Sequence, residues 1–122
     1  MVRATWEELI ADERPEHVVL LSAFRTHLRR IPEVEERVHR TEVAYARDRV
    51  FASAYVKSGW LEVAIDLLRT VEHPLLRMAF ATTKKVTTHR FTLGSPDQLA
   101  GLDDLFREAA ETVGPGTKEA KA

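Results

Sequence analysis

Basic side chains gather in two parts of the sequence and form its clearest pattern for binding chemistry. One group lies within residues 47–57 and the other within residues 84–90, with aromatic residues close to the first. Guanidinium and ammonium groups bind phosphate oxygens and aromatic rings stack on bases, so the pattern suits an anionic ligand or single-stranded nucleic acid. The residues predicted to bind such a partner are Arg47, Arg49, Lys57, Lys84, Lys85, Arg90, Tyr45, Tyr55 and Trp60.

Two other interpretations of these basic residues stay open. Edge strands carry Lys and Arg to prevent sheet-to-sheet aggregation, and the abundant glutamates could neutralise a basic patch. The formal net charge of −1 also excludes a basic field over the whole protein. Any binding of nucleic acid must therefore be local.

Patterns for catalysis and metal binding are weak. The chain has no cysteine, which excludes disulfides, thiolate zinc sites and a cysteine nucleophile. The five histidines are scattered, the serines lack a nucleophile elbow, and there is no phosphate-binding glycine loop. Glu62 and Asp66 share one side of a predicted strand, where paired carboxylates are common on a solvated face. We predict no catalytic residue, metal or cofactor, and favour a protein that is not an enzyme.

Size and composition suit one soluble domain. The chain has 122 residues, of which 44% are hydrophobic and 30% charged. We expect a single domain over residues 1–116 and a disordered tail over residues 117–122. Charges interrupt the N-terminus too soon for a signal peptide, and no run approaches the ~20 apolar residues that span a bilayer. The expected location is the cytoplasm, without membrane association.

Local patterns predict three helices and four strands. Thr5 to Glu8 and Ser95 to Gln98 have capping-box spacing, and residues 16–30 repeat apolar side chains at helical spacing. The predicted helices span residues 5–11, 16–30 and 95–113, and the predicted strands span residues 43–47, 50–57, 60–68 and 84–93. Residues 33–42 suit either a short helix or an extended segment. Residues 75–81 are expected to form an irregular or short helical crossing.

These elements predict an α+β fold. The expected architecture is a two-layer sandwich, in which N-terminal and C-terminal helices pack on one face of a four-stranded, mainly antiparallel sheet. Alternation in residues 61–67 separates an apolar side from a polar one. By the same rule His89 shares a face with Phe91 and Leu93, and Arg90 lies opposite. The uncovered face of the sheet must meet solvent, a ligand or a second subunit.

Several segments resemble a known family. They are Val43-Ala44-Tyr45-Ala46, Phe51-Ala52, Trp60-Leu61-Glu62-Val63 and Thr88-His89-Arg90-Phe91-Thr92-Leu93, followed by the capped terminal helix. Residues 16–113 resemble the bacterial domain-of-unknown-function family number 5655. More distantly they are similar to YdhG-like and MmcQ/YjbR-like small α+β domains, the latter often described as DNA-binding-like. The resemblance implies a compact α+β fold with a curved antiparallel sheet, and brings no catalytic residues.

Three functional hypotheses follow. The first is a small binding module whose basic sheet rim engages an anionic partner. The second is a homodimeric accessory or structural protein that uses apolar positions of the uncovered face, with the segment from Leu75 to Phe80. The third is a small enzyme or small-molecule-binding protein, with a pocket formed by Tyr45, Tyr55, Trp60, Glu62, Asp66 and His89.

Overall fold

The computed structural model describes residues 3–116, and the predicted disordered tail at residues 117–122 lies outside the described residues. Three α-helices, six β-strands and one 3-10 helix follow one another along the chain. In order they are α1 (Trp6–Ile10), α2 (Pro15–Arg29), β1 (Glu35–Val38), β2 (Val43–Ala46), β3 (Val50–Lys57), β4 (Trp60–Leu67), β5 (Leu76–Ala81), β6 (Thr87–Leu93), the 3-10 helix η1 (Pro96–Leu102) and α3 (Asp103–Thr112).

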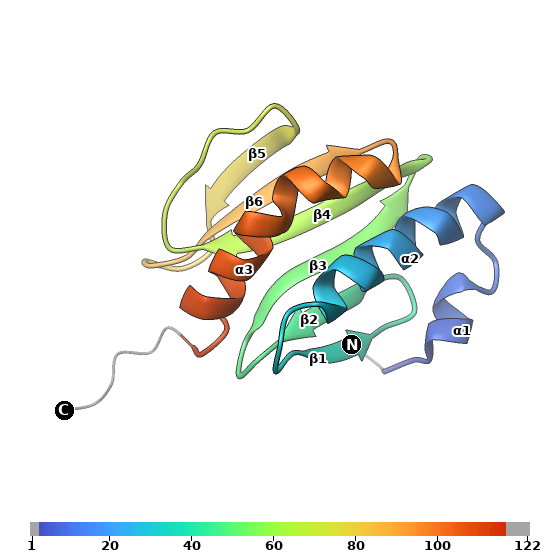
Figure 1. Cartoon of the computed structure of the whole chain (residues 1–122), viewed down its shortest axis with the longest axis horizontal. Coiled ribbons are helices and arrows are strands. Elements are labelled where there is room, and N and C mark those ends of the chain that lie inside the picture. The colour runs from blue at the N-terminus through green and yellow to red at the C-terminus, as the bar shows by residue number, and fades with distance from the viewer. Residues whose placement is uncertain (1–2, 117–122) are drawn as a thin grey trace.

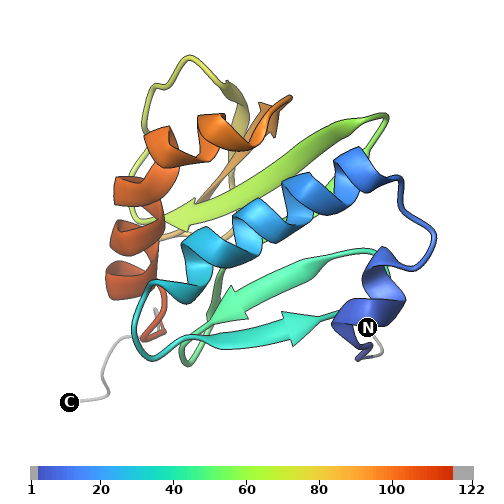
Figure 2. The same ribbon diagram turned by 45° about the vertical axis from the view of Figure 1, so that its right-hand side comes forward.

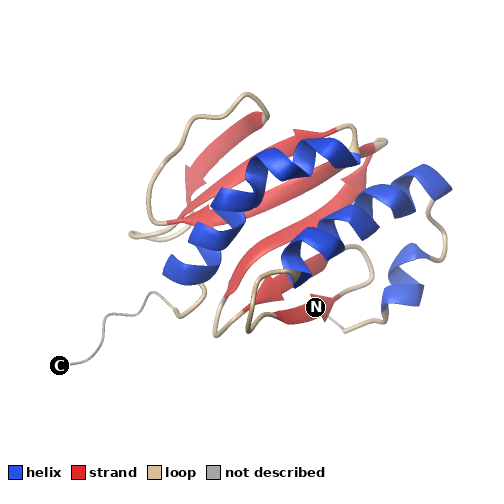
Figure 3. Cartoon of the chain, viewed as in Figure 1, coloured by secondary structure: helices blue, strands red, loops and turns tan. Residues whose placement is uncertain are grey.

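All six strands form a single antiparallel sheet in the order β1-β2-β3-β4-β6-β5. Helices from both ends of the chain, α2 and α3, lie side by side on one face of it (Figures 1 and 2). The predicted α+β class and the helix-covered antiparallel sheet are therefore confirmed. The predicted number of four strands is wrong, because one further strand adds to each edge (Figure 3).

The two additional strands come from segments that have no clear alternation of apolar and polar residues. The segment 33–42, left open between helix and extended chain, contains β1, a short strand rich in charge. The segment 75–81, expected as an irregular or helical crossing, is the strand β5. A half-buried strand is recognised by polar residues on one side and apolar residues on the other. Both sides of β5 are exposed and its residues are mostly apolar, so this alternation is missing from its sequence. Pairing with β6 makes it a strand.

The capping boxes at Thr5 and Ser95 are both present. The predicted C-terminal helix is, however, divided into η1 and α3 at Asp103, so a single helix from 95 to 113 is a wrong prediction. Leu99 and Leu102 are both buried at a spacing of three residues, which matches the period of a 3-10 helix. Gly101, a poor helix former, lies just before the change.

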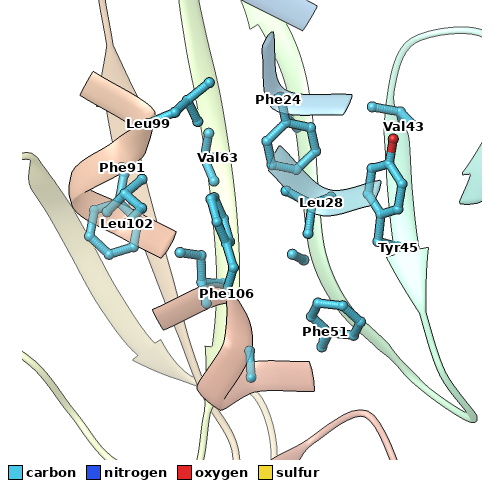
Figure 4. Packing of buried hydrophobic residues seen from close by; sticks show 14 of the residues in the cluster. Phe24, Leu28, Val43, Tyr45, Phe51, Val63, Phe91, Leu99, Leu102 and Phe106 are labelled. Atoms are coloured by element: carbon cyan, nitrogen blue, oxygen red, sulfur yellow. The ribbon is translucent and has the colours of Figure 1, made fainter. Parts of the chain in front are cut away.

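The core lies between the sheet and the helices α2 and α3 (Figure 4). The predicted alternation in β4 is confirmed, since Leu61, Val63, Ile65 and Leu67 are all buried beneath the helices. Phe24 of α2 stands edge-on to Tyr45 of β2 and to Phe106 of α3, with ring centres 5.6 and 5.7 Å apart. One phenylalanine thus connects both helices and the sheet.

Candidate functional site

The sheet face opposite α2 and α3 is not covered by any helix among residues 3–116, and we call it the open face. Strand registers place polar and aromatic side chains of β3, β4 and β6 in cross-strand rows on it. The first row contains Lys57 and Trp60, and the next pairs Tyr55 with Glu62 and Glu62 with Thr92. These rows lie near the β3–β4 turn.

The open face is hollowed at that end. A depression of about 390 Å³ is lined by Lys57, Ser58, Trp60, Glu62, Arg77 and Thr92. A smaller hollow of about 60 Å³ shares Glu62 with it and continues towards the centre of the sheet, where it is lined by Glu42, Ser53, Tyr55, Val63, Ala64 and Arg90. The two form one continuous polar surface with an aromatic wall, because Trp60 borders the larger hollow.

Trp60 is half exposed, at 50%, and rests on the backbone at Gly94. A Cβ atom added at Gly94 would approach the indole ring to 2.8 Å, closer than two carbon atoms pack. Glycine therefore leaves room for the six-membered part of the indole at the end of β6. With half of its surface in solvent, the indole can stack on a flat ligand.

Arg90 lies across the centre of the open face. Its Nη1 donates to the Tyr55 hydroxyl at 3.3 Å, and its guanidinium carbon is 5.9 Å from the centre of the Phe80 ring. The residue between Arg90 and β3 is Ala64, whose small side chain leaves room for the guanidinium to cross β4. Among the described residues, no carboxylate lies within ion-pairing distance of Arg90, and its buried Nε has no hydrogen-bond partner there.

The two carboxylates of β4 lie low in this face and are held by threonines of β6. Both Glu62 oxygens accept from the Thr92 hydroxyl, at 3.0 and 3.1 Å, and Arg77 lies 3.8 Å away. Asp66 accepts from the Thr88 hydroxyl at 2.7 Å and lies 3.5 Å from Arg49. Burial raises the pKa of Asp66 above its usual range, although Thr88 and Arg49 oppose that rise.

We expect Asp66→Asn to stabilise the protein near neutral pH. Because the folded pKa of Asp66 lies above its unfolded value of 3.8, the folded state holds more protons in that window and stability falls as the pH rises through it. Asparagine removes the cost of burying this charge, so the free energy of unfolding near pH 7 should exceed that of the parent. Urea unfolding at several pH values should show the gain at about pH 7 and none below about pH 4.

Asp12→Asn, at an exposed position after α1, is the control and should leave stability unchanged at both pH values. A loss of more than about 1 kcal/mol in Asp66→Asn near neutral pH would contradict this prediction, since it would mean that the ion pair with Arg49 outweighs burial.

The residues predicted from the sequence as a basic rim divide between the two ends of the sheet. Arg49 and the Lys84–Lys85 turn lie at one end, where Leu67 pairs with Thr87. Lys57 lies at the other end, and β3 alone separates it from Arg49 by about 25 Å. The structure therefore brings only Lys57, Trp60, Tyr55 and Arg90 of the predicted set into one region.

Two predicted ligand-binding residues are engaged elsewhere. Tyr45 was expected to be available for stacking, but it is fully buried on the helix-covered face, where its hydroxyl donates to Glu36 at 2.5 Å. Arg47 donates to the main-chain oxygens of Pro32 and Ala110, at 3.0 and 3.4 Å. Its guanidinium thus links β2 to the ends of both main helices. Tyr45 can take no part in a surface site.

The pocket of the third hypothesis does not converge. Tyr55, Trp60, Glu62 and Asp66 belong to the open face, whereas Tyr45 and His89 lie on the helix-covered one. His89 is fully buried and its Nε2 accepts the main-chain N–H of Val71 at 3.0 Å. The predicted placement of His89 with Phe91, opposite Arg90, is confirmed.

The strand β5 contributes to this surface, which the sequence patterns did not predict. Arg77, Met78 and Phe80 border the open face beside β6, and Met78 and Phe80 are 51% and 41% exposed. The sequence of β5, Leu-Arg-Met-Ala-Phe-Ala, has one arginine among alternating large and small apolar residues, a pattern that indicates an exposed strand. It was not recognised because exposed apolar residues resemble a buried segment.

Within residues 3–116, no cluster of three or more histidine, aspartate or glutamate side chains is arranged to hold a metal ion. None of the helices in that range has the length and apolar character needed to cross a membrane. The side chains that line the open face can stack, form ion pairs and donate or accept hydrogen bonds.

Comparison with known protein families gives a match over most of the chain. The sequence profile of a family described as "Domain of unknown function (DUF5655)" matches residues 6–112. No curated protein and no solved structure matches the chain.

Proposed function

The chain belongs to the DUF5655 family, a domain of unknown function, and we propose that it is a non-catalytic module that binds single-stranded nucleic acid on its open face. The observation that carries this proposal is the hollow of about 390 Å³ beside the half-exposed Trp60, which has cations on its walls and a fixed carboxylate among its lining residues. A nucleotide has three parts that match this arrangement: a flat ring, exocyclic N–H donors and a phosphate.

Stacking is the first contribution. The exposed side of the Trp60 ring accepts a base, and Phe80 and Tyr55 extend the aromatic surface along the sheet on either side of Arg90. Bases in a single strand are free to turn onto such a surface, whereas those in a duplex are already stacked on one another. The arrangement therefore favours single strands.

Charge is the second contribution. The cations of the larger hollow, Lys57 and Arg77, are exposed, and the Arg77 side chain is 68% accessible. The carboxylate beside them is 8% exposed and its two oxygens already share the hydroxyl hydrogen of Thr92. An approaching phosphate thus meets the cations first, although the net charge of the chain is −1.

Glu62 gives the hollow a preference among bases. Its carboxylate is held in place by Thr92 and accepts hydrogen bonds, so it suits the amino group of cytosine better than the carbonyl oxygen of thymine. We therefore expect oligodeoxycytidine to bind more tightly than oligodeoxythymidine of the same length.

Trp60 fluorescence tests the proposal directly. The chain has two tryptophans, so a Trp6→Phe background leaves Trp60 as the single emitter. Titration with oligodeoxycytidine of about 15 nucleotides should quench this emission, with affinity that falls steeply between about 50 and 200 mM salt. Trp60→Ala, measured with labelled oligonucleotide, should weaken binding about 5- to 150-fold, the effect of losing one stacked base.

The controls are alanine substitutions of a charged and an apolar residue at exposed positions away from the open face. Lys57→Ala and Arg77→Ala should each weaken binding and lower the salt slope by about 0.7, whereas Arg14→Ala and Val19→Ala, on exposed positions at α2, should change neither. An unquenched Trp60, or a Trp60→Ala variant that binds as tightly as the parent, would refute the proposal.

A further inference from the structure

We propose that two copies of this chain pair through β5 of each, in an antiparallel arrangement about a two-fold axis at Ala79, to form one continuous sheet. This inference does not depend on nucleic-acid binding. It rests on the exposed edge of the sheet, where β5 has β6 as a neighbour on one side and no strand on the other (Figure 1).

The two edges of the sheet differ in how they are protected against such pairing. The edge strand β1 has four residues, three of them charged, and residues 3 and 4 extend it: Arg3 bridges to His39 and the Ala4 N–H donates to Val38 at 2.9 Å. Short length, charge and a covering segment are the usual means of blocking an edge. β5 has six residues with a single charge, and five of them are exposed.

The hydrogen bonds at the two ends of β5 show which of its main-chain groups point away from β6. Thr82 donates to the Val86 oxygen at 2.9 Å and Thr92 donates to the Leu75 oxygen at 3.3 Å. Because an antiparallel ladder directs alternate residues towards the neighbouring strand, Ala79 and Ala81 direct their N–H and C=O groups away from β6. The bulge of β5 lies between Leu76 and Met78, so the strand beyond it is regular.

The side chains make this edge self-complementary about Ala79. With Ala79 opposite its own copy, Met78 lies opposite Phe80 of the second copy, and Arg77 lies opposite Ala81. Met78 and Phe80 both project on the open face. Across the two-fold axis they form a non-hydrogen-bonded pair, in which side chains lie closer together than in a hydrogen-bonded pair. The thioether of methionine packs favourably on an aromatic ring. An axis at Arg77 would instead place two arginines opposite each other, which is unfavourable.

Charge exchange at Ala79 tests both the dimer and its register. Sedimentation velocity from about 1 µM to about 1 mM should show the parent passing from one chain to two. Ala79→Glu and Ala79→Lys should each weaken dimerisation on the order of fivefold, because like charges face each other across the axis. An equimolar mixture of the two variants should restore the dimer, which a general loss of folding would not allow.

Ala100→Glu, an exposed alanine in η1, and Trp60→Ala, which tests nucleic-acid binding alone, should both dimerise as the parent does. Ala79→Pro removes an outward N–H without touching the pairing to β6 and should dimerise more than tenfold more weakly. A parent that stays a single chain up to about 1 mM, or variants that dimerise unchanged, would overturn the proposal.

Discussion

Replacing Phe24 with alanine is expected to lower the free energy of unfolding by about 3–5 kcal/mol. The ring is fully buried and makes edge-to-face contacts with Tyr45 and Phe106 (Figure 4). Its removal leaves a cavity where α2, α3 and the sheet meet. The elements around this cavity are held by their own contacts to the sheet, so they cannot collapse to fill it.

Urea denaturation followed by circular dichroism measures this loss, with the change expected in the midpoint at an unaltered slope. Val19→Ala is the matched control, because it removes an apolar side chain from the same helix at a site 55% exposed and should cost less than about 0.5 kcal/mol. If Phe24→Ala cost less than about 1 kcal/mol, the packing of α2 against α3 and β2 described here would be wrong.

Replacing Arg25 with methionine is expected to cost about 2 kcal/mol, between the values for an exposed and a fully buried ion pair, because this pair keeps some contact with solvent. Arg25 of α2 donates to both oxygens of Glu36 on β1, at 2.9 and 3.0 Å, and its guanidinium lies 4.3 Å from the centre of the Trp6 ring. Glu36 also accepts from Tyr45. Methionine fills the space but leaves this half-buried carboxylate without its main counter-charge.

The pH dependence of stability identifies this interaction. Burial by itself would raise the pKa of Glu36, but hydrogen bonds from Arg25 and Tyr45 outweigh burial and hold the pKa below its usual value of 4.5. The folded state therefore binds fewer protons than the unfolded state in that range. The stability that Glu36 contributes is complete above pH 4.5 and is lost as the pH falls through the pKa of Glu36 in the folded state. In Arg25→Met the stability lost on acidification should be smaller than in the parent, or should become a gain.

Arg29→Met is the control for charge, because Arg29 is 3.4 Å from Glu36 and more than half exposed. Because Arg29 makes the smallest of the contributions that lower the Glu36 pKa, the acid-side loss of stability in Arg29→Met should stay much closer to that of the parent than the loss in Arg25→Met does. Should Arg25→Met show the same acid-side slope as the parent, the lowered pKa of Glu36 would have a different origin from the bonds described.

These two predictions differ in how far the sequence anticipated them. Phe24 belongs to the apolar stripe of residues 16–30, and helical periodicity predicted its burial. Arg25 lies outside that stripe, and periodicity does not predict the partner of a polar side chain. Its partner Glu36 lies in a segment whose conformation stayed open, so an ion pair eleven residues apart could not be found from local pattern.

The same distinction explains Tyr45 and Tyr55. Both lie in adjacent strands of one hairpin, yet Tyr45 contacts Phe24 in the core and Tyr55 bonds to Arg90 on the open face. All four residues of β2 are buried, so its sequence has no solvated side from which to infer direction. Only the position of α2 over this strand decides which tyrosine a ligand can reach.

By itself the sequence determined the first two helices, the capping boxes at Thr5 and Ser95, the hairpin from β3 to β4 and the face on which His89 and Arg90 lie. These features depend on residues within a few positions of one another, where periodicity and capping act. The tertiary structure decided that β5 completes the sheet, that basic residues divide between its ends, and that Arg77, Trp60 and Glu62 share one hollow. Each of these depends on strand order and register, which are set by packing between segments distant in the chain.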